Sequence, residues 1–141
     1  MIKLTAEMKA LIDNALANGT PCILGTASLT GEPGISYRGS MMAFNDKSLA
    51  YWDRTKRTAM EHIEMNPKVV VLFRDPQLRK AWKFFGDAEI HRQGPLREQI
   101  KGRIVEAELA RDLNQNGFGV IIHLNHISLL SGEVIQHQDY D

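Results

Sequence analysis

A cluster of basic residues directly before a predicted helix is the feature of this sequence best suited to chemistry. The cluster contains Arg54, Lys56 and Arg57. Thr58 and Glu61 follow at the spacing of a capping box, which predicts that the helix begins there. The first turn of a helix presents free N–H groups and partial positive charge, and arginine adds a bidentate donor pair for phosphate. The segment therefore predicts a site for an organic phosphate, with a solvated basic loop as the alternative.

A predicted hairpin brings further cations toward this segment. If residues 45–47 form its loop, Ser40 lies opposite Trp52 and Arg38 lies opposite Arg54. Two like charges directly opposite each other cost a few tenths of a kcal/mol, roughly, in a strand pair. An anion bound between the two arginines would remove that cost. The inference depends on the register, because a slip of one residue reverses the faces.

Aromatic side chains near these cations supply flat apolar surface of the kind that suits a planar ring system. They are Tyr51, Trp52, Trp82, Phe84 and Phe85. The alternative for each is packing in the core or in a subunit interface. Residues 79–85 also mix basic and aromatic side chains, a pattern that can stack nucleic acid bases. Because 17 basic residues balance 17 acidic ones, we expect no nucleic acid partner.

Other catalytic or metal-binding motifs are missing from the sequence. There is no dinucleotide-binding glycine motif, no phosphate-binding Walker loop and no serine nucleophile elbow. His123 and His126 are three residues apart, which in a strand directs them to opposite faces and argues against a metal site. Cys22 has no cationic neighbour in the sequence and is interpreted as a small hydrophobic residue.

The overall composition is that of an ordinary globular protein. The chain has 141 residues with 43% hydrophobic and 24% charged residues, which predicts one domain over residues 1–141. A single cysteine rules out an intrachain disulfide and favours a reducing compartment. The sequence has no signal peptide and no apolar run long enough to span a membrane. We therefore expect a soluble, cytoplasmic protein without a membrane partner.

Periodicity and turn residues predict a mainly β protein with short helices. One helix is expected over residues 6–18 with Thr5 as its N-cap, another over 58–66, and a helical stripe over 96–113. The predicted strands cover residues 22–29, 35–44, 48–53, 69–73, 82–90, 118–124 and 127–130, and the tail 136–141 is polar. About six strands at this spacing predict a closed barrel with helical additions.

The order of three segments resembles the FMN-binding split-barrel family that includes the pyridoxamine 5′-phosphate oxidases. The segments read TASLTGEPGISYRGSMMAF, then SLAYWDRTKRTAMEHIEMNPKVVVLF, then KFFGDAEI. They contain the T-x-x-x-x-G-x-P element at residues 26–33, the Asn66-Pro67 helix end and the aromatic-Gly-x-Ala element at residues 85–88. The similarity spans about residues 6–130. It implies a six-stranded antiparallel split β-barrel with short peripheral helices, acting as a homodimer.

The resemblance also implies one FMN per subunit, bound between the two subunits. The residues implied to meet the flavin or its ribityl chain are Arg38, Gly39 and Ser40, with backbone N–H groups of Ser40 and Met41 near the ring. Those implied to line the ring and sugar are Trp52, Asp53 and Arg54. Those implied to hold the phosphate are Lys56, Arg57 and Thr58. Those implied to come from the partner subunit are Arg79, Lys80 and Trp82.

The activity implied by the resemblance is two-electron redox chemistry by an FMN-dependent oxidoreductase on a small molecule. Pyridoxamine phosphate is not the expected substrate, because this sequence ends at residues 137–141 without the arginine- and histidine-containing C-terminal region of those oxidases. Another amine, a nicotinamide donor or a quinone are alternatives. A second hypothesis is a non-catalytic module of the same fold that binds flavin, deazaflavin or haem, with His91, His123 or His126 as axial ligands.

Overall fold

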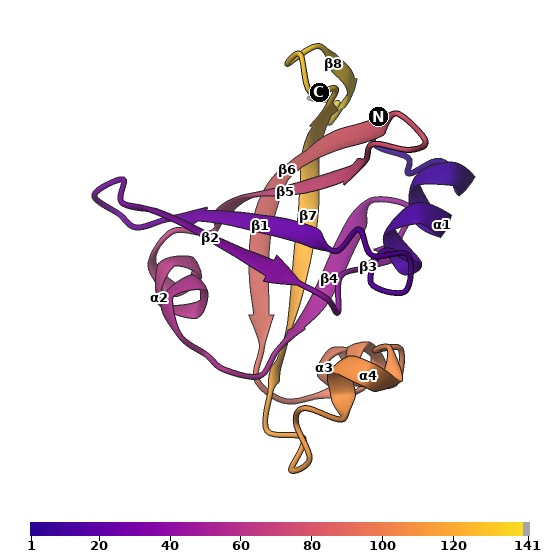
Figure 1. Ribbon diagram of the computed structural model, residues 1–141. Helices are drawn as coiled ribbons and strands as arrows, with labels where there is room; N and C mark the ends of the chain where they lie inside the picture. The colour runs from indigo at the N-terminus through magenta and orange to yellow at the C-terminus, as the bar shows by residue number, and fades with distance from the viewer. Residues whose placement is uncertain (140–141) are drawn as a thin grey trace.

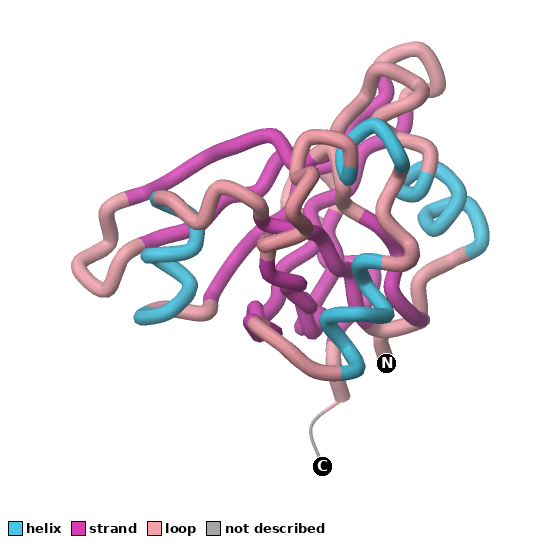
Figure 2. The backbone as a smooth tube through the Cα atoms, turned by 90° about the horizontal axis from the view of Figure 1, so that it is seen from below, coloured by secondary structure: helices cyan, strands magenta, loops and turns pink. Residues whose placement is uncertain are grey.

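The computed structural model describes residues 1–139, in which an antiparallel sheet is surrounded by short helices (Figure 1). Seen from below, the strands occupy the centre and the helices lie on the periphery (Figure 2). The helices are α1 (Ala6–Asp13), α2 (Thr58–Met65), α3 (Pro95–Lys101) and α4 (Glu106–Leu109). The strands are β1 (Cys22–Ala27), β2 (Pro33–Arg38), β3 (Met42–Asn45), β4 (Ser48–Asp53), β5 (Lys68–Asp75), β6 (Lys80–His91), β7 (Phe118–Ser128) and β8 (Val134–His137).

The strands form one sheet in the order β2-β1-β5-β6-β7-β4-β3, and β8 pairs with β7. Every strand pair is antiparallel. The strands β2 and β3 are consecutive in the chain but lie at the two edges of the sheet, and only residues 39–41 connect them. So short a connection requires the sheet to curl until its edges meet. The predicted mainly β, antiparallel barrel fold is therefore confirmed.

Within residues 1–139 the sheet has eight strands, whereas the resemblance implies six. The expected single strand over residues 35–44 divides into β2 and β3 at Gly39, because the hydroxyl of Ser40 bonds to the backbone of Trp52. The expected pair 118–124 and 127–130 is instead the single strand β7. The strand β8 (Val134–His137) was not predicted and overlaps the start of the predicted polar tail 136–141, of which residues 140–141 lie outside the described residues.

The two predicted helix starts have opposite outcomes. Thr5 caps α1, since its Oγ1 accepts a hydrogen bond from the backbone N–H of Met8 at 3.1 Å, as predicted. The capping box predicted at the start of α2 is wrong. The cap residue is Arg57, its side chain makes no capping hydrogen bond, and Thr58 is already the first helical residue.

Alternating strand residues build two hydrophobic clusters on opposite faces of the sheet. The larger fills the barrel interior and includes Tyr51, Phe84 and Trp82, whose ring stacks on Phe73 at 5.8 Å. The smaller lies outside the sheet, where Ile100 of α3 packs with Ala50, Trp52 and Ile121. The strand β4 is buried along its entire length because it contributes to both clusters.

The edge strand β3 is covered by side chains from two helical segments. Arg103, which follows α3, donates from Nη1 to the carbonyl of Phe44 at 2.9 Å and from Nη2 to that of Ala43 at 2.7 Å. The carboxylate of Asp13 in α1 accepts from the N–H of Ala43 at 2.8 Å. Backbone groups that a neighbouring strand would otherwise satisfy are thereby paired.

No helix within residues 1–139 has the length and apolar character needed to cross a lipid bilayer.

Candidate functional site

The junction between the two sheet edges is fixed by Ser40. Its buried hydroxyl accepts a hydrogen bond from the N–H of Trp52 at 2.9 Å and donates to the carbonyl of the same residue at 3.2 Å. The prediction that Ser40 lies beside Trp52 is therefore confirmed. The predicted pairing of Arg38 with Arg54 is wrong, because Arg38 belongs to β2 and pairs with Cys22 in β1.

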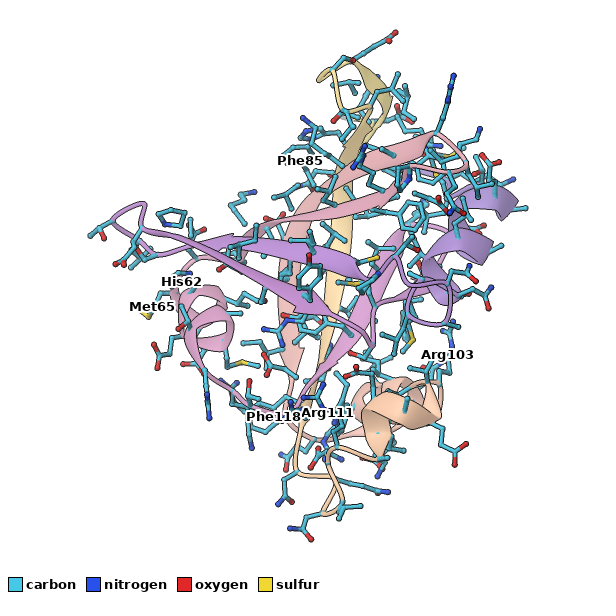
Figure 3. All side chains as sticks on the ribbon, in the orientation of Figure 1. His62, Met65, Phe85, Arg103, Arg111 and Phe118 are labelled. Atoms are coloured by element: carbon cyan, nitrogen blue, oxygen red, sulfur yellow. The ribbon has the colours of Figure 1, made fainter. Side chains whose placement is uncertain are left out.

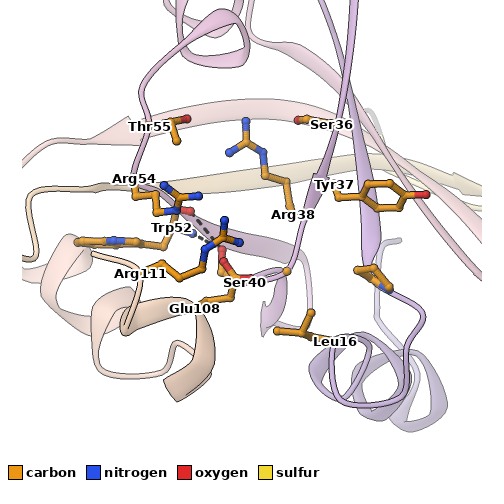
Figure 4. Close-up of a pocket in the computed structure, with 12 residues that line it drawn as sticks. Leu16, Ser36, Tyr37, Arg38, Ser40, Trp52, Arg54, Thr55, Glu108 and Arg111 are labelled. Atoms are coloured by element: carbon orange, nitrogen blue, oxygen red, sulfur yellow. Dashed lines mark hydrogen bonds between the residues drawn. The ribbon is translucent and has the colours of Figure 1, made fainter. Parts of the chain in front are cut away.

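A cavity of about 360 Å³ opens beside this junction (Figure 4). Its volume is within the range of small-molecule sites. The lining residues are Leu16, Pro21, Ser36, Tyr37, Arg38, Gly39, Ser40, Trp52, Arg54, Thr55, Glu108 and Arg111. Arg38 and Arg54 thus reach one cavity although they are not a strand pair.

The lining of the cavity is rich in cations. Arg38, Arg54 and Arg111 contribute three guanidinium groups, and Glu108 contributes the one carboxylate among the lining residues. Within residues 1–139, neither Arg54 nor Arg111 forms an ion pair. Ser36 and Thr55 add hydroxyl groups. This donor set is suited to a phosphate group, which arginine binds through parallel N–H donors.

Arg38 is held in place by residues of β4. Its Nη1 lies 3.7 Å from Oδ2 of Asp53, and its guanidinium lies 5.1 Å from the centre of the Tyr51 ring. Burial raises the pKa of Tyr51 far above its ordinary value, with a smaller lowering effect from Arg38. The hydroxyl of Tyr51, Oδ2 of Asp53 and Nε of Arg38 are all buried without a hydrogen bond.

Glu108 and Arg111 were not identified from the sequence. They lie in and just after α4, and Figure 3 labels the side chain of Arg111 beside this helical region. Gly39 permits the close approach of this segment: a Cβ at that position would lie 2.3 Å from Oε1 of Glu108. Gly39 and α4 are far apart in the chain, so their contact leaves no local sequence pattern. The sequence therefore held no signal that could identify Glu108 or Arg111.

The indole of Trp52 is bound to the same segment. Its Nε1 donates to Oδ2 of Asp112 at 2.9 Å, the guanidinium of Arg97 lies 4.8 Å from the ring centre, and the residue is 5% exposed. Burial tends to raise the pKa of Asp112, but hydrogen bonds from Trp52, Gly117 and Asn116 together lower it below its ordinary value. The ring therefore contributes an edge of the cavity and is otherwise enclosed.

The residues predicted to hold the phosphate lie just beyond this cavity. Lys56 has a left-handed backbone with φ of 54°, and its Nζ donates to the carbonyl of Asn116 at 3.0 Å. Arg57 and Thr58 are exposed, and neither lines the cavity. Of the other predicted residues of this region, Met41 is buried at 4% exposure and Asp53 is fully buried.

The residues predicted to come from the partner subunit lie away from this cavity in their own subunit. Arg79 is in the β5–β6 turn, and Lys80 forms an ion pair with Glu7 of α1 at 3.2 Å. Trp82 belongs to the barrel core and is 6% exposed, which leaves little of its ring for contact with another chain.

Metal and thiol chemistry find no support in the described part of the chain. Within residues 1–139, no group of three or more His, Cys, Asp or Glu side chains is arranged to hold a metal ion. His126 stacks on Phe85 with ring centres 4.3 Å apart. Cys22 is fully buried, and burial raises its pKa to about 12, so its thiolate is not available as a nucleophile.

Comparisons with known proteins agree on one family. The family model described as pyridoxamine 5′-phosphate oxidase matches residues 4–121. A comparison with curated proteins finds no match. Among solved structures, HupZ of Group A Streptococcus is 30% identical with a TM-score of 0.74, and the alignment covers 94% of this chain and 98% of HupZ.

Two more distant structures share the fold alone. An FMN-binding protein from Syntrophomonas wolfei is 12% identical with a TM-score of 0.63, covering 94% of this chain and 89% of that one. HutZ, the haem storage protein of Vibrio cholerae, is 18% identical with a TM-score of 0.66, covering 90% and 94%.

Proposed function

The chain belongs to the pyridoxamine 5′-phosphate oxidase family, and from this premise we propose that it binds FMN and acts as an FMN-dependent oxidoreductase on a small molecule. The observation that carries the proposal is the cavity where Arg38, Arg54 and Arg111 converge beside the Ser40–Trp52 junction. Three guanidinium groups and two hydroxyl groups match the donors that a phosphate monoester requires. The match of the donor set, together with the family, favours FMN as the ligand.

The remaining lining has a composition suited to the rest of the cofactor. Leu16, Pro21 and Tyr37 line the cavity along with the arginines, so it has apolar as well as cationic walls. Gly39 has no side chain, which allows a ligand to approach the backbone at the junction. Lys56, Arg57 and Thr58 follow directly in the chain and stay in the proposal as outer contacts of the phosphate.

The bound flavin would supply the two-electron chemistry, and the protein would supply orientation and electrostatics. In this scheme Arg38, Arg54 and Arg111 bind the phosphate, and the Ser40 hydroxyl keeps the two strands that carry the site together. No side chain is assigned as a general acid or base. The electron donor or acceptor is proposed to be a small molecule, and the cytoplasmic location predicted from the sequence is retained.

A second copy of the chain is proposed to complete the site. Ile35 and Tyr37 are 80% and 70% exposed on the outer face of β2. Ile35 also lines an apolar groove of about 560 Å³ together with Val70 and Phe85. Contiguous exposed apolar surface of this kind is typical of an interface. Because Tyr37 also lines the cavity, a subunit seated on this face would reach the ligand.

The cofactor proposal is tested with the purified full chain and FMN. We expect the protein to take up FMN and to show a flavin absorbance spectrum. Arg54→Met should weaken FMN binding by about ten-fold or more and leave riboflavin binding nearly unchanged, since only FMN has the phosphate. Arg92→Met, which removes an exposed guanidinium paired with Glu64 outside the cavity, is the control. A protein that takes up neither flavin would refute the proposal.

Catalysis and assembly are tested separately. Turnover with reduced nicotinamide and an electron acceptor supports an enzyme, whereas tight binding without turnover supports a flavin-binding module. Sedimentation should give a dimer that Ile35→Lys converts to a monomer, while Leu113→Lys, at a residue 87% exposed, has no effect. A monomeric wild-type protein that binds FMN fully would contradict the role of the second subunit.

Haem is the less favoured ligand of this cavity. Within residues 1–139, no histidine is among the residues that line it. His91 and His123 instead share the carboxylate of Glu89 on the outer face of the sheet, at 2.5 and 3.3 Å. An absorbance band characteristic of ligated haem after addition of hemin, without FMN uptake, would reverse this preference.

A further inference from the structure

We propose that Asp53 is a positioning residue that holds the walls bearing Arg38 and Arg54 in place relative to each other, and that it does so without touching the ligand. The proposal rests on the proposed function, because it concerns the site assigned there to the phosphate of FMN. It concerns Asp53 itself, which the family resemblance implied to line the ring and sugar. In the structure this residue is 0% exposed and is not among the residues that line the cavity.

The carboxylate of Asp53 divides its two oxygens between the two walls. Oδ2 lies 3.7 Å from Nη1 of Arg38, which is at the end of β2. Oδ1 accepts a hydrogen bond of 2.9 Å from the backbone N–H of Lys56. One buried side chain on β4 therefore contacts both the strand that carries Arg38 and the turn that carries Arg54.

Arg38 needs such a contact because its side chain is long and almost enclosed. Its side chain is 14% exposed, and Nε is buried without a hydrogen bond. Its guanidinium faces Tyr51 on one side, at 5.1 Å, and lines the cavity on another. Fixing a flexible side chain in advance lowers the entropy that ligand binding must overcome. The buried charge of Asp53 is the one acidic group within ion-pair distance of this arginine among residues 1–139.

The turn that carries Arg54 and Thr55 depends on the second oxygen. Lys56 has φ of 54°, a left-handed conformation that a residue with a side chain adopts only when its surroundings enforce it. An aspartate oxygen bonded to an N–H three residues later stabilises a turn of this kind. Since Arg54 and Thr55 lie within the turn and line the cavity, loss of the bond would disorder that wall.

The two possible roles of Asp53, as a negative charge near the phosphate and as a positioning residue, predict opposite changes in FMN affinity for Asp53→Asn. The asparagine can still accept from Lys56 through Oδ1, but its NH₂ group faces Arg38 and carries no negative charge. If Asp53 mattered only as a negative charge near the phosphate, its removal would strengthen FMN binding. If it positions Arg38, FMN binding weakens. We expect weakening by about ten-fold, the scale of a hydrogen bond to a charged group, with riboflavin nearly unchanged.

Flavin fluorescence titration of the full chain with FMN and with riboflavin measures the effect. Asp46→Asn is the matched control, because it removes an acidic partner of Lys9 at the surface. In an Arg38→Met background, Asp53→Asn should have no further effect on FMN. Tighter FMN binding by Asp53→Asn, or equal losses for FMN and riboflavin, would overturn the proposal.

A second readout requires no flavin and begins with the wild-type protein. In nuclear magnetic resonance of the wild-type protein, the Nε–H group of Arg38 should be rigid and protected from exchange, unlike that of the exposed Arg111. Equal mobility of the two groups would overturn the proposal. If the wild-type protein failed to bind FMN but Arg38 were rigid and became mobile in Asp53→Asn, the proposed function would fail and the positioning role would stand.

Discussion

Replacing Asp112 by Asn should weaken the attachment of the helical segment after β6 to the cavity wall. The carboxylate accepts three hydrogen bonds, from Nε1 of Trp52 at 2.9 Å, from the N–H of Gly117 at 2.8 Å and from the N–H of Asn116 at 3.2 Å. An asparagine oxygen at the Oδ2 position can retain the bonds from Trp52 and Gly117. Its NH₂ group would then face the N–H of Asn116, so the variant loses that hydrogen bond and the negative charge that strengthens the other two.

The expected loss of stability follows from these contacts. A hydrogen bond to a charged group contributes about 1.5–3 kcal/mol and one between neutral groups about 0.5–1.5 kcal/mol. One bond is lost and two become bonds to a neutral oxygen, and solvent reaches part of this turn, so we expect a loss of about 2 kcal/mol. Urea unfolding followed by circular dichroism measures the difference, with Asp46→Asn as a surface control expected to have a much smaller effect, because an exposed ion pair contributes little to stability. A loss below about 1 kcal/mol for Asp112→Asn would refute the reasoning.

The same variant has a defined dependence on pH. The pKa of Asp112 is lower in the folded protein than its ordinary value, so the charged form stabilises the fold. That stabilisation is complete above the unfolded pKa of about 3.9 and is lost as the pH falls through the lower folded value. The difference between wild type and variant should therefore be constant from about pH 7 to pH 5 and shrink below about pH 4. A difference that grew on acidification would contradict the assignment.

Three further outcomes are expected. Gly86→Ala should destabilise the protein by about 1–3 kcal/mol or more in urea unfolding, because its Cβ would lie 2.3 Å from the carbonyl oxygen of His123; Gly102→Ala, whose Cβ comes no closer than 3.5 Å to another atom, should cost nothing. Cys22 should resist alkylation at mildly alkaline pH until the protein unfolds, as judged by mass spectrometry, since burial raises its pKa to about 12; rapid native-state labelling would contradict its burial. Arg111→Met should weaken FMN binding by about ten-fold relative to riboflavin binding, and an unchanged ratio of the two affinities would show that this residue does not bind the phosphate.

The elements that depend on local sequence were predictable, and those that depend on distant contacts were not. The α1 cap at Thr5 and the buried strand over residues 69–73 follow from neighbouring residues and have the expected structure. The division of residues 35–44 at Gly39 does not, because it depends on a hydrogen bond between Ser40 and the backbone of Trp52. A serine within an otherwise regular pattern gives no indication that its hydroxyl replaces a strand partner.

The residues of the candidate site also fall into two groups, those that the local sequence indicated and those that only distant contacts bring to the cavity. The sequence indicated a cationic region near Arg38 and Arg54, and the structure brings both to one cavity. It did not indicate Glu108 or Arg111, which lie within and just after a four-residue helix far along the chain. Side-chain type alone does not separate the two alternatives for Trp82, a role beside a planar ring and packing in the core; the alternation of residues in β6 places its side chain in the barrel core.

The contacts made by Arg103 and Asp13 along β3 have a consequence for behaviour at high protein concentration. An open sheet edge is a template on which another chain can add a strand, leading to uncontrolled polymerisation. Here two carbonyls and one N–H of that edge are already occupied by side chains. We expect charge-removing substitutions at these two positions to leave those backbone groups unpaired and to favour addition of a strand from another chain, which light scattering at high protein concentration would detect.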